Sequence, residues 1–186
     1  MISVYLPSLS YDEKKDIIGL SMQKALETLY PSLSLAGVDE MRSHYGEYFF
    51  SVPQDASTLF EGVVDALSNL RDSGVKLAVA TGKSRNGLDK ALISTGLKSF
   101  FDIERCADET KSKPDPLMLI QIAQYFKAEP RSMLMVGDTE FDLAMARSFD
   151  MDSVGVSYGV HDVQRLNLHK PIAIIDSISE LKAHVI

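Results

Sequence analysis

The sequence predicts an α/β fold: a three-layer, doubly wound parallel sheet with a small helical module ahead of it. From Leu59 onward, short apolar runs alternate with amphipathic stretches of about 10–15 residues, which is typical of βαβ units. Ahead of that point, apolar residues recur at helical spacing and no convincing strand pair is present. We therefore expect a partial helical cap over residues 1–56 and an α/β core over residues 57–186.

Three helices are expected in the first module. Ser10 and Glu13 have the spacing of a capping box, which predicts a helix over Tyr11–Ile18, and Ser21 is placed to start a second helix. A third helix has one face formed by apolar and aromatic residues: Val38, Met41, Tyr45, Tyr48 and Phe49. Such a tyrosine stripe is more typical of half-buried packing than of a ligand pocket.

The core elements follow in regular alternation. Helices are expected over Gly62–Asp72, Ser84–Ser94, Leu117–Phe126 and Glu140–Ser148. Strands are expected over Val75–Ala80, Phe101–Cys106, Met133–Val136, Ser153–Val156 and Ile172–Ile175. Since the helices alternate with the strands, both faces of the sheet should be covered.

The composition limits the possible binding partners and the cellular compartment of the protein. A net charge of −7 argues against nucleic acid and anionic membranes as general partners. Cys106 is the only cysteine, which excludes an intramolecular disulfide and a cysteine-based zinc cluster and favours a reducing cytoplasm. The first residues lack the features of a signal peptide, and no apolar run approaches the roughly 20 residues that span a bilayer.

Two carboxylates follow the apolar run Met133–Val136. Asp138 comes where that strand should end, and Asp142 lies in the first turn of the next helix. Open α/β sheets bind ligands at the carboxyl ends of their strands, and oxygen-only ligands suit Mg²⁺. Helix capping explains the same residues about equally well when this stretch is considered alone.

A second strand end carries Thr81, Gly82 and Lys83. The threonine offers a hydroxyl, and the backbone N–H groups after it open a helix, which is a natural phosphate seat. Taken alone, Thr81 is better explained as a helix cap. The resemblance to a nucleotide-binding P-loop fails, because the upstream glycine of that motif is absent.

A third candidate is Lys113, which precedes Pro114 and Pro116. The two prolines should stiffen the turn before the helix at Leu117, so this lysine could reach a phosphate or a carboxylate pair. The usual alternative is a solvated loop lysine, and that describes Lys111 better.

Taken in order, these motifs resemble the haloacid dehalogenase-like hydrolases, in particular the phosphoglycolate phosphatase and pyrophosphatase branch. The resemblance rests on Lys76–Lys83, Lys113–Pro116, Met135–Asp142 and Val154–Gly159, with Ile17–Ser21 matching the helical cap of that branch. It implies a Rossmann-like core and the hydrolysis of a small phosphomonoester with Mg²⁺.

The resemblance also implies a role for each matching residue. Thr81, with Gly82 and Lys83, would bind the phosphoryl group. Lys113 would offset its charge, and Lys113 and Asp138 would act in catalysis. Asp138 and Asp142 would hold Mg²⁺. The partner would be a small phosphorylated metabolite.

The sequence departs from the family in one motif that the catalytic mechanism requires. The family's first motif, Asp-x-Asp-x-Thr, supplies the nucleophile and the general acid/base, and it does not occur in this sequence. We interpret this as a truncated product or a start codon set too far downstream, so that the first strand and its catalytic loop are missing. The alternative is a non-catalytic phosphate- and metal-binding protein. A receiver-like or nucleotide-binding domain is the weakest hypothesis.

The missing strand has a consequence for the sheet. In the family it lies between the strands that correspond here to Val75–Ala80 and Met133–Val136, both of which are apolar on both faces. We expect one of three outcomes: Met1–Leu6 occupies the position, the two strands close up, or another chain donates a strand. Marginal stability or self-association should accompany the defect.

Overall fold

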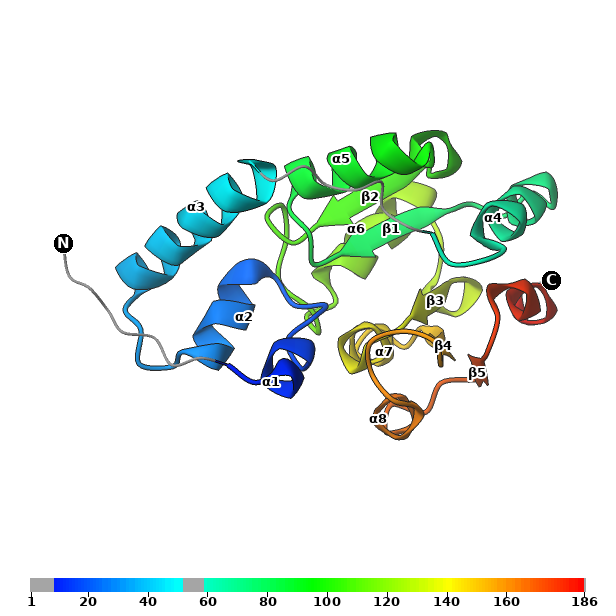
Figure 1. The fold of residues 1–186 in the computed structure, drawn as a ribbon. Helices are drawn as coiled ribbons and strands as arrows, with labels where there is room; N and C mark the ends of the chain where they lie inside the picture. Colours follow the sequence, from blue (N-terminus) through cyan, green and yellow to red (C-terminus); the bar gives the residue numbers. More distant parts are fainter. Residues whose placement is uncertain (1–8, 52–58, 186) are drawn as a thin grey trace.

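A computed structural model describes residues 9–51 and 59–185 and confirms the α/β fold class (Figure 1). The helical module and the α/β core are both present, and every strand pair within a sheet is parallel. Within these described ranges, no helix is long and apolar enough to cross a membrane. The predicted boundary at residue 56 lies outside the described residues.

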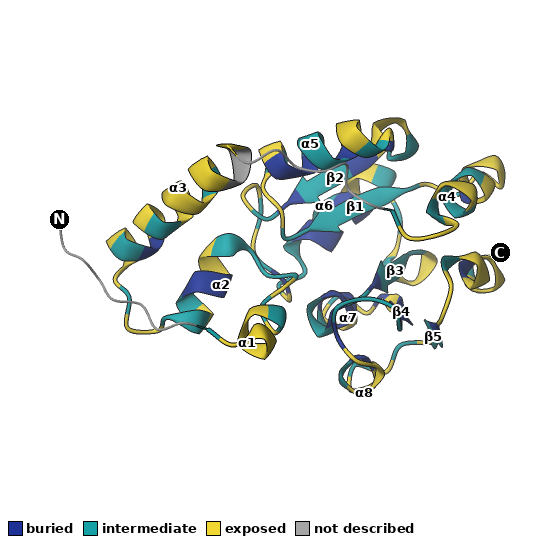
Figure 2. Cartoon of the chain, viewed as in Figure 1, coloured by how far each residue is buried: buried dark blue, intermediate teal, exposed yellow. Residues whose placement is uncertain are grey.

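The first module consists of α1 (Tyr11–Lys15), α2 (Met22–Leu29) and α3 (Leu35–Ser51). The capping box predicted at Ser10 and Glu13 is present. Ala25, Leu26 and Val38 are buried, whereas much of α3 is exposed (Figure 2). Tyr48 is 69% exposed, so the expectation of half-buried packing is wrong for that residue.

The core contains five strands and their connecting helices. In chain order these are α4 (Val63–Asp72), β1 (Ala78–Thr81), α5 (Arg85–Thr95), η1 (Lys98–Phe100), β2 (Ile103–Cys106), α6 (Leu117–Phe126), η2 (Pro130–Ser132), β3 (Leu134–Gly137), α7 (Glu140–Arg147), β4 (Asp152–Val156), α8 (Val163–Asn167), β5 (Ala173–Ile175) and η3 (Ile178–His184). β1, β2 and β5 are shorter than predicted, and β1 begins three residues after Val75, whereas β3 is shifted by one residue and β4 is one residue longer. Four helical segments, η1, η2, α8 and η3, were not predicted.

The strands form two sheets. β1 pairs with β2, and β3 pairs with β4, which in turn pairs with β5. β1 and β3 therefore do not pair with each other, and the expectation that they close up is wrong (Figure 1). The proposed position of Met1–Leu6 lies outside the described residues.

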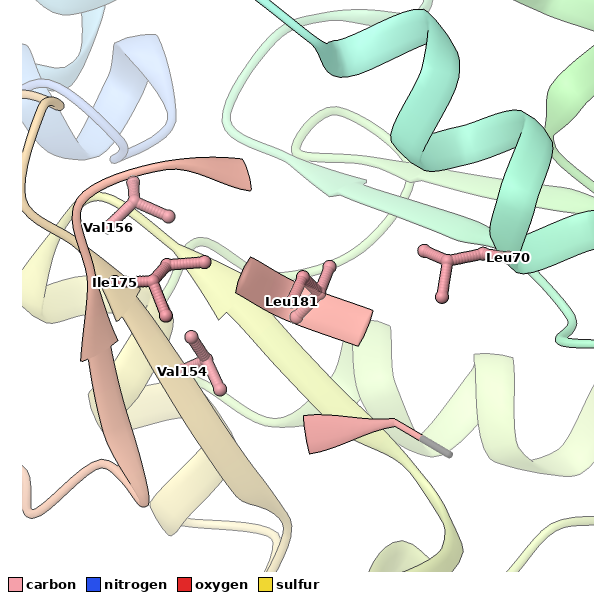
Figure 3. Close-up of a cluster of buried hydrophobic side chains, with 5 residues drawn as sticks. All are labelled: Leu70, Val154, Val156, Ile175 and Leu181. Carbon is pink, nitrogen blue, oxygen red and sulfur yellow. The ribbon is translucent and has the colours of Figure 1, made fainter. Parts of the chain in front are cut away.

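Helices on both faces join the two sheets. On one face, Leu70 of α4 lies in a core cluster with Val154, Val156, Ile175 and Leu181 (Figure 3). Val63 and Leu67, also on α4, pack instead against the cluster of α5 and β2. On the opposite face, Met118 and Leu119 of α6 pack with residues of α7, and Ala80 and Met135 pack against that same cluster. Thus α4 and α6 connect the sheets across the interval between β1 and β3.

The burial of β1 and β3 reflects the division of the strands into two sheets. All four residues of β1 and the first three of β3 are half-buried rather than buried, although all of them except Thr81 have apolar side chains. The outer part of the core is well packed: Cys106, at the end of β2, is fully buried, and this burial raises the pKa of its thiol to about 11. The incomplete burial of β1 and β3 arises because each strand pairs on one side only.

Candidate functional site

Asp138 follows β3 directly, and the loop after β4 fixes its carboxylate. The N–H of Val160 donates to Asp138 Oδ2 over 3.1 Å, and the N–H of His161 donates to the Asp138 carbonyl over 3.0 Å. A Cβ at Gly159 would come within 2.1 Å of Asp138 Cβ, so only glycine permits this approach. One face of the Asp138 side chain is therefore held by the Gly159–His161 loop.

Asp142 and Lys113 form a buried ion pair. Lys113 Nζ lies 2.5 Å from Asp142 Oδ1, and each residue is 5% exposed. The other carboxylate oxygen accepts from Thr139 Oγ1 at 2.6 Å and from the Thr139 N–H at 3.2 Å. Asp142 is thus both the partner of Lys113 and the third residue of the α7 capping box. Lys111, by contrast, is exposed and pairs with Asp115.

Thr81, Gly82 and Lys83 connect β1 to α5. Thr81 Oγ1 accepts from the Lys83 N–H at 3.2 Å, and the helix N-cap is Ser84 rather than Thr81. The hydroxyl of Thr81 is therefore not needed to cap α5. The side chain of Lys83 is exposed, and its carbonyl accepts from the Ala107 N–H at 3.1 Å.

The segment Gly19–Ser21 crosses the carboxyl edge of the core. A Cβ at Gly82 would lie 2.5 Å from the Leu20 carbonyl oxygen, which shows how closely the two backbones approach. Gly19 has a φ of +106°, and a Cβ there would lie 2.8 Å from Thr139 Oγ1. The Ser21 N–H donates to Ser112 Oγ at 2.9 Å. The helical module is therefore joined to the core at the edge where the candidate residues lie.

One cavity of about 920 Å³ brings these residues together. Its lining includes every site residue predicted from the sequence: Thr81, Gly82, Lys83, Lys113, Asp138 and Asp142. From the helical module it adds Arg42 and Tyr45 of α3, and between the sheets it reaches Val79, Ala80, Met135 and Val136. The cavity thus has a polar end at the carboxyl edge and an apolar end between the sheets.

Sequence reasoning missed Thr139 and the Gly159–His161 loop. Thr139 is 1% exposed and its spacing to Asp142 is a capping-box signal, so it could have been found. In the loop, Gly159 ends the stretch Val154–Gly159 that supports the resemblance, whereas Val160 and His161 give no comparable signal. His161 is 2% exposed; its Nδ1 accepts from the Glu140 N–H at 3.0 Å, while Nε2 has no hydrogen-bond partner among the residues described.

His161 should make stability depend on pH. Burial lowers the pKa of His161, and the positive charge of Arg165 adds to the decrease. The unfolded chain then takes up a proton at higher pH than the native state does. Stability should fall as pH drops below about 6.5, by up to about 1.4 kcal/mol per pH unit. Replacing His161 with asparagine should flatten the dependence of the melting temperature on pH between 7 and 5. An unchanged slope would contradict this origin.

The fold and the cavity define an α/β protein with a carboxylate and lysine site at the sheet edge beneath a helical cap, and sequence comparison assigns its family. The model of the family described as haloacid dehalogenase-like hydrolase matches residues 2–156. The chain belongs to this family, and the resemblance predicted from its motifs is confirmed.

The curated relatives are phosphatases. The chain is 33% identical over 184 residues to the probable phosphatase IndB of Dickeya dadantii, covering 94% of this chain and 79% of that protein. It is 30% identical over 142 residues to the phosphoglycolate phosphatase of Salmonella typhimurium, covering 76% of this chain and 56% of the relative. The chain therefore spans about half the length of that phosphoglycolate phosphatase.

Solved structures show the same fold. A predicted phosphoglycolate phosphatase from Haemophilus somnus superposes with a TM-score of 0.81 at 23% identity, covering 97% of this chain and 84% of the other. The β-phosphoglucomutase of Clostridium difficile gives a TM-score of 0.80 at 20% identity, with 95% and 80% covered. At these identities the likeness concerns the fold alone.

Proposed function

We propose that the cavity binds the phosphate group of a small phosphorylated metabolite together with Mg²⁺. The observation that carries this proposal is the convergence of Thr81, Lys113, Asp138 and Asp142 on one cavity at the carboxyl edge of the strands. The phosphatase names of the relatives support the same ligand class. Phosphoglycolate is one substrate of this class. A soluble, cytoplasmic enzyme remains our prediction.

The oxygen atoms available as ligands at this site meet the requirements of Mg²⁺ in part. Within the described ranges, no group of three or more His, Cys, Asp or Glu side chains could hold a metal. Asp138 has one carboxylate oxygen engaged by Val160, so its other oxygen could ligate the ion directly. Asp142 is engaged by Lys113 and Thr139 and would act through water. Mg²⁺ binds through as few as one or two carboxylates plus substrate phosphate, so binding should be weak without phosphate. When bound, the ion would neutralise phosphate charge.

Hydrolysis needs a nucleophile besides these groups. Three described residues of the cavity lining carry carboxylates: Asp108, Asp138 and Asp142. Asp108 accepts from the Arg85 N–H at the start of α5, and Asp142 is paired with Lys113. The resemblance implies a covalent mechanism whose nucleophile is a carboxylate, and Asp138 would be committed to the metal. We therefore propose phosphate and metal binding as the function of this chain's own residues. Phosphomonoester hydrolysis is the activity of the complete family site.

Calorimetry with inorganic phosphate and Mg²⁺ tests this proposal. Phosphate should bind more tightly with Mg²⁺ than without it, and Asp138→Asn should remove that Mg²⁺ dependence. Asp115→Asn, which changes a half-buried carboxylate outside the cavity lining, is the matched control and should leave the titration unchanged. If Asp138→Asn binds Mg²⁺ and phosphate as the parent does, the site lies elsewhere. Turnover of a phosphomonoester by this chain would show that it contains a nucleophile.

A further inference from the structure

Arg165, on α8, joins the helical module to the core. Its Nη1 donates to Asp16 Oδ1, just after α1, and its Nη2 donates to Glu140 Oε1, in the first residue of α7, so α1, α7 and α8 meet here (Figure 1). We propose that Arg165 is a positioning residue of the candidate site. It keeps the segment Gly19–Ser21, which lines the cavity, in place against the core.

The two halves of this contact differ in exposure. The side chains of Arg165 and Glu140 are 29% and 25% exposed, whereas that of Asp16 is 58% exposed. Hydrogen bonding to Glu140, ahead of that to Asp16, raises the pKa of Arg165. An ion pair is weaker where water screens it, so the bond to Asp16 should break first and leave Arg165 on α7. Release of the helical module from the core therefore depends on Asp16.

The segment held in this way touches both sides of the candidate site. A Cβ at Gly82 would come within 2.5 Å of the Leu20 carbonyl oxygen. A Cβ at Gly19 would lie 2.8 Å from Thr139 Oγ1, and this hydroxyl donates to Asp142 Oδ2 at 2.6 Å. The helical module thus reaches the proposed phosphate seat and the partner of a candidate metal ligand. A shift of the segment would change the cavity at both places.

Glu140 connects Arg165 to the loop that fixes Asp138. Its carboxylate binds Arg165, while its N–H donates to Nδ1 of His161 at 3.0 Å. The N–H of His161 in turn donates to the Asp138 carbonyl at 3.0 Å. These contacts run without interruption from Asp16 in the helical module to the second candidate metal ligand. The same guanidinium therefore bears on both carboxylates of the site.

Hydrogen exchange of the Ser21 amide, measured by NMR on the full chain, tests the proposal without a ligand. The Ser21 N–H donates to Ser112 Oγ of the core at 2.9 Å, so its exchange rate reports release of the segment. Arg165→Met and Asp16→Ala should each speed this exchange about threefold, the effect of losing a partly exposed ion pair. An unchanged rate in both variants would overturn the proposal. Should Arg165→Met fail to fold, Asp16→Ala, which keeps the pair on α7, still decides.

Two controls separate release of the segment from general instability. The Ser157 N–H donates to a carbonyl of β5 inside the core, and in Asp16→Ala it should exchange as in the parent. Lys24→Met removes a cation of the helical module whose ion pair is with Glu27 on the same helix, and it should leave the exchange of the segment unchanged. Equal acceleration at Ser157, or an effect of Lys24→Met as large as that of Asp16→Ala, would contradict the assigned role.

The double variant Asp16→Ala/Arg165→Met tests whether the two residues act on the segment through one contact. Its Ser21 amide should exchange no faster than that of Arg165→Met alone, because residues that share a contact do not have additive effects. If the two effects multiply instead, Arg165 and Asp16 act independently and the proposed contact does not position the segment.

Inorganic phosphate with Mg²⁺ tests the connection to the site, and only this part of the experiment rests on the proposed function. Where calorimetry shows that phosphate binds, saturating phosphate should slow Ser21 exchange in the parent, because a ligand favours the form that it binds. Unchanged exchange would show that Arg165 positions the helical module but not the site, and would overturn the proposal. If calorimetry shows no binding, the proposed function fails, while the exchange rates without ligand still decide whether Arg165 holds the segment.

Discussion

Replacing Lys113 with methionine is expected to lower the free energy of unfolding by about 3–5 kcal/mol. Lys113 and Asp142 are each 5% exposed, and their ion pair is the contact that compensates the charge of Asp142 Oδ1. Methionine keeps the apolar stem but leaves a buried carboxylate without its cation. Since a domain has only about 5–15 kcal/mol of stability, the variant should be close to unfolding. Urea denaturation followed by circular dichroism measures the change.

Two further variants isolate the cause. Lys111→Met removes an exposed pair with Asp115 and should cost no more than about 1 kcal/mol. Combining Lys113→Met with Asp142→Asn removes both charges while keeping a side chain that can bond to Thr139, and it should recover part of the loss. A cost below 1 kcal/mol for Lys113→Met would show that the pair does not stabilise the fold.

The second large effect concerns the edges of β1 and β3 that do not pair. Among the described residues each of these strands pairs on one side only, so two apolar strand edges are open to another copy of the chain. We expect sedimentation to show species heavier than a monomer and the melting temperature to rise with protein concentration, because association stabilises by mass action.

Ala80→Pro is the matching variant for this effect. It should reduce self-association, because it removes a backbone N–H of β1 that faces away from β2, whereas Ile174→Pro on β5 should leave self-association unchanged. A cooperative melt that is independent of concentration, together with a monomeric sedimentation profile, would show that the open edges do not drive association. That outcome would also show that the helices α4 and α6 suffice to hold the two sheets.

The sequence by itself determined the fold class, the main helices of the core and the gathering of the candidate residues at one edge of the strands. The spacing of apolar residues within a short stretch indicates each helix or strand. Because the carboxyl ends of parallel strands lie at the same edge of a sheet, Thr81 and Asp138 could be predicted to lie close together without coordinates. The stiff turn at Pro114 similarly predicted that Lys113 would be fixed, and the structure buries it against Asp142. The roles of these residues in binding and catalysis remain predictions.

Only the tertiary structure decided how these residues are held. The Gly159–His161 loop reaches Asp138 from more than 20 residues away, and Gly82 lies beneath a cap segment about 60 residues earlier in the chain, a contact that no local pattern encodes. The resemblance implied a gap between β1 and β3, but the side chains of these strands did not indicate that the sheet is divided there. The local pattern of β1 and β3 is typical of central strands, because their side chains are apolar on both faces where helices cover the sheet. Whether another strand lies beside β1 or β3 depends on backbone pairing with a segment that is distant in the sequence. The side chains of β1 and β3 carry no information about that pairing.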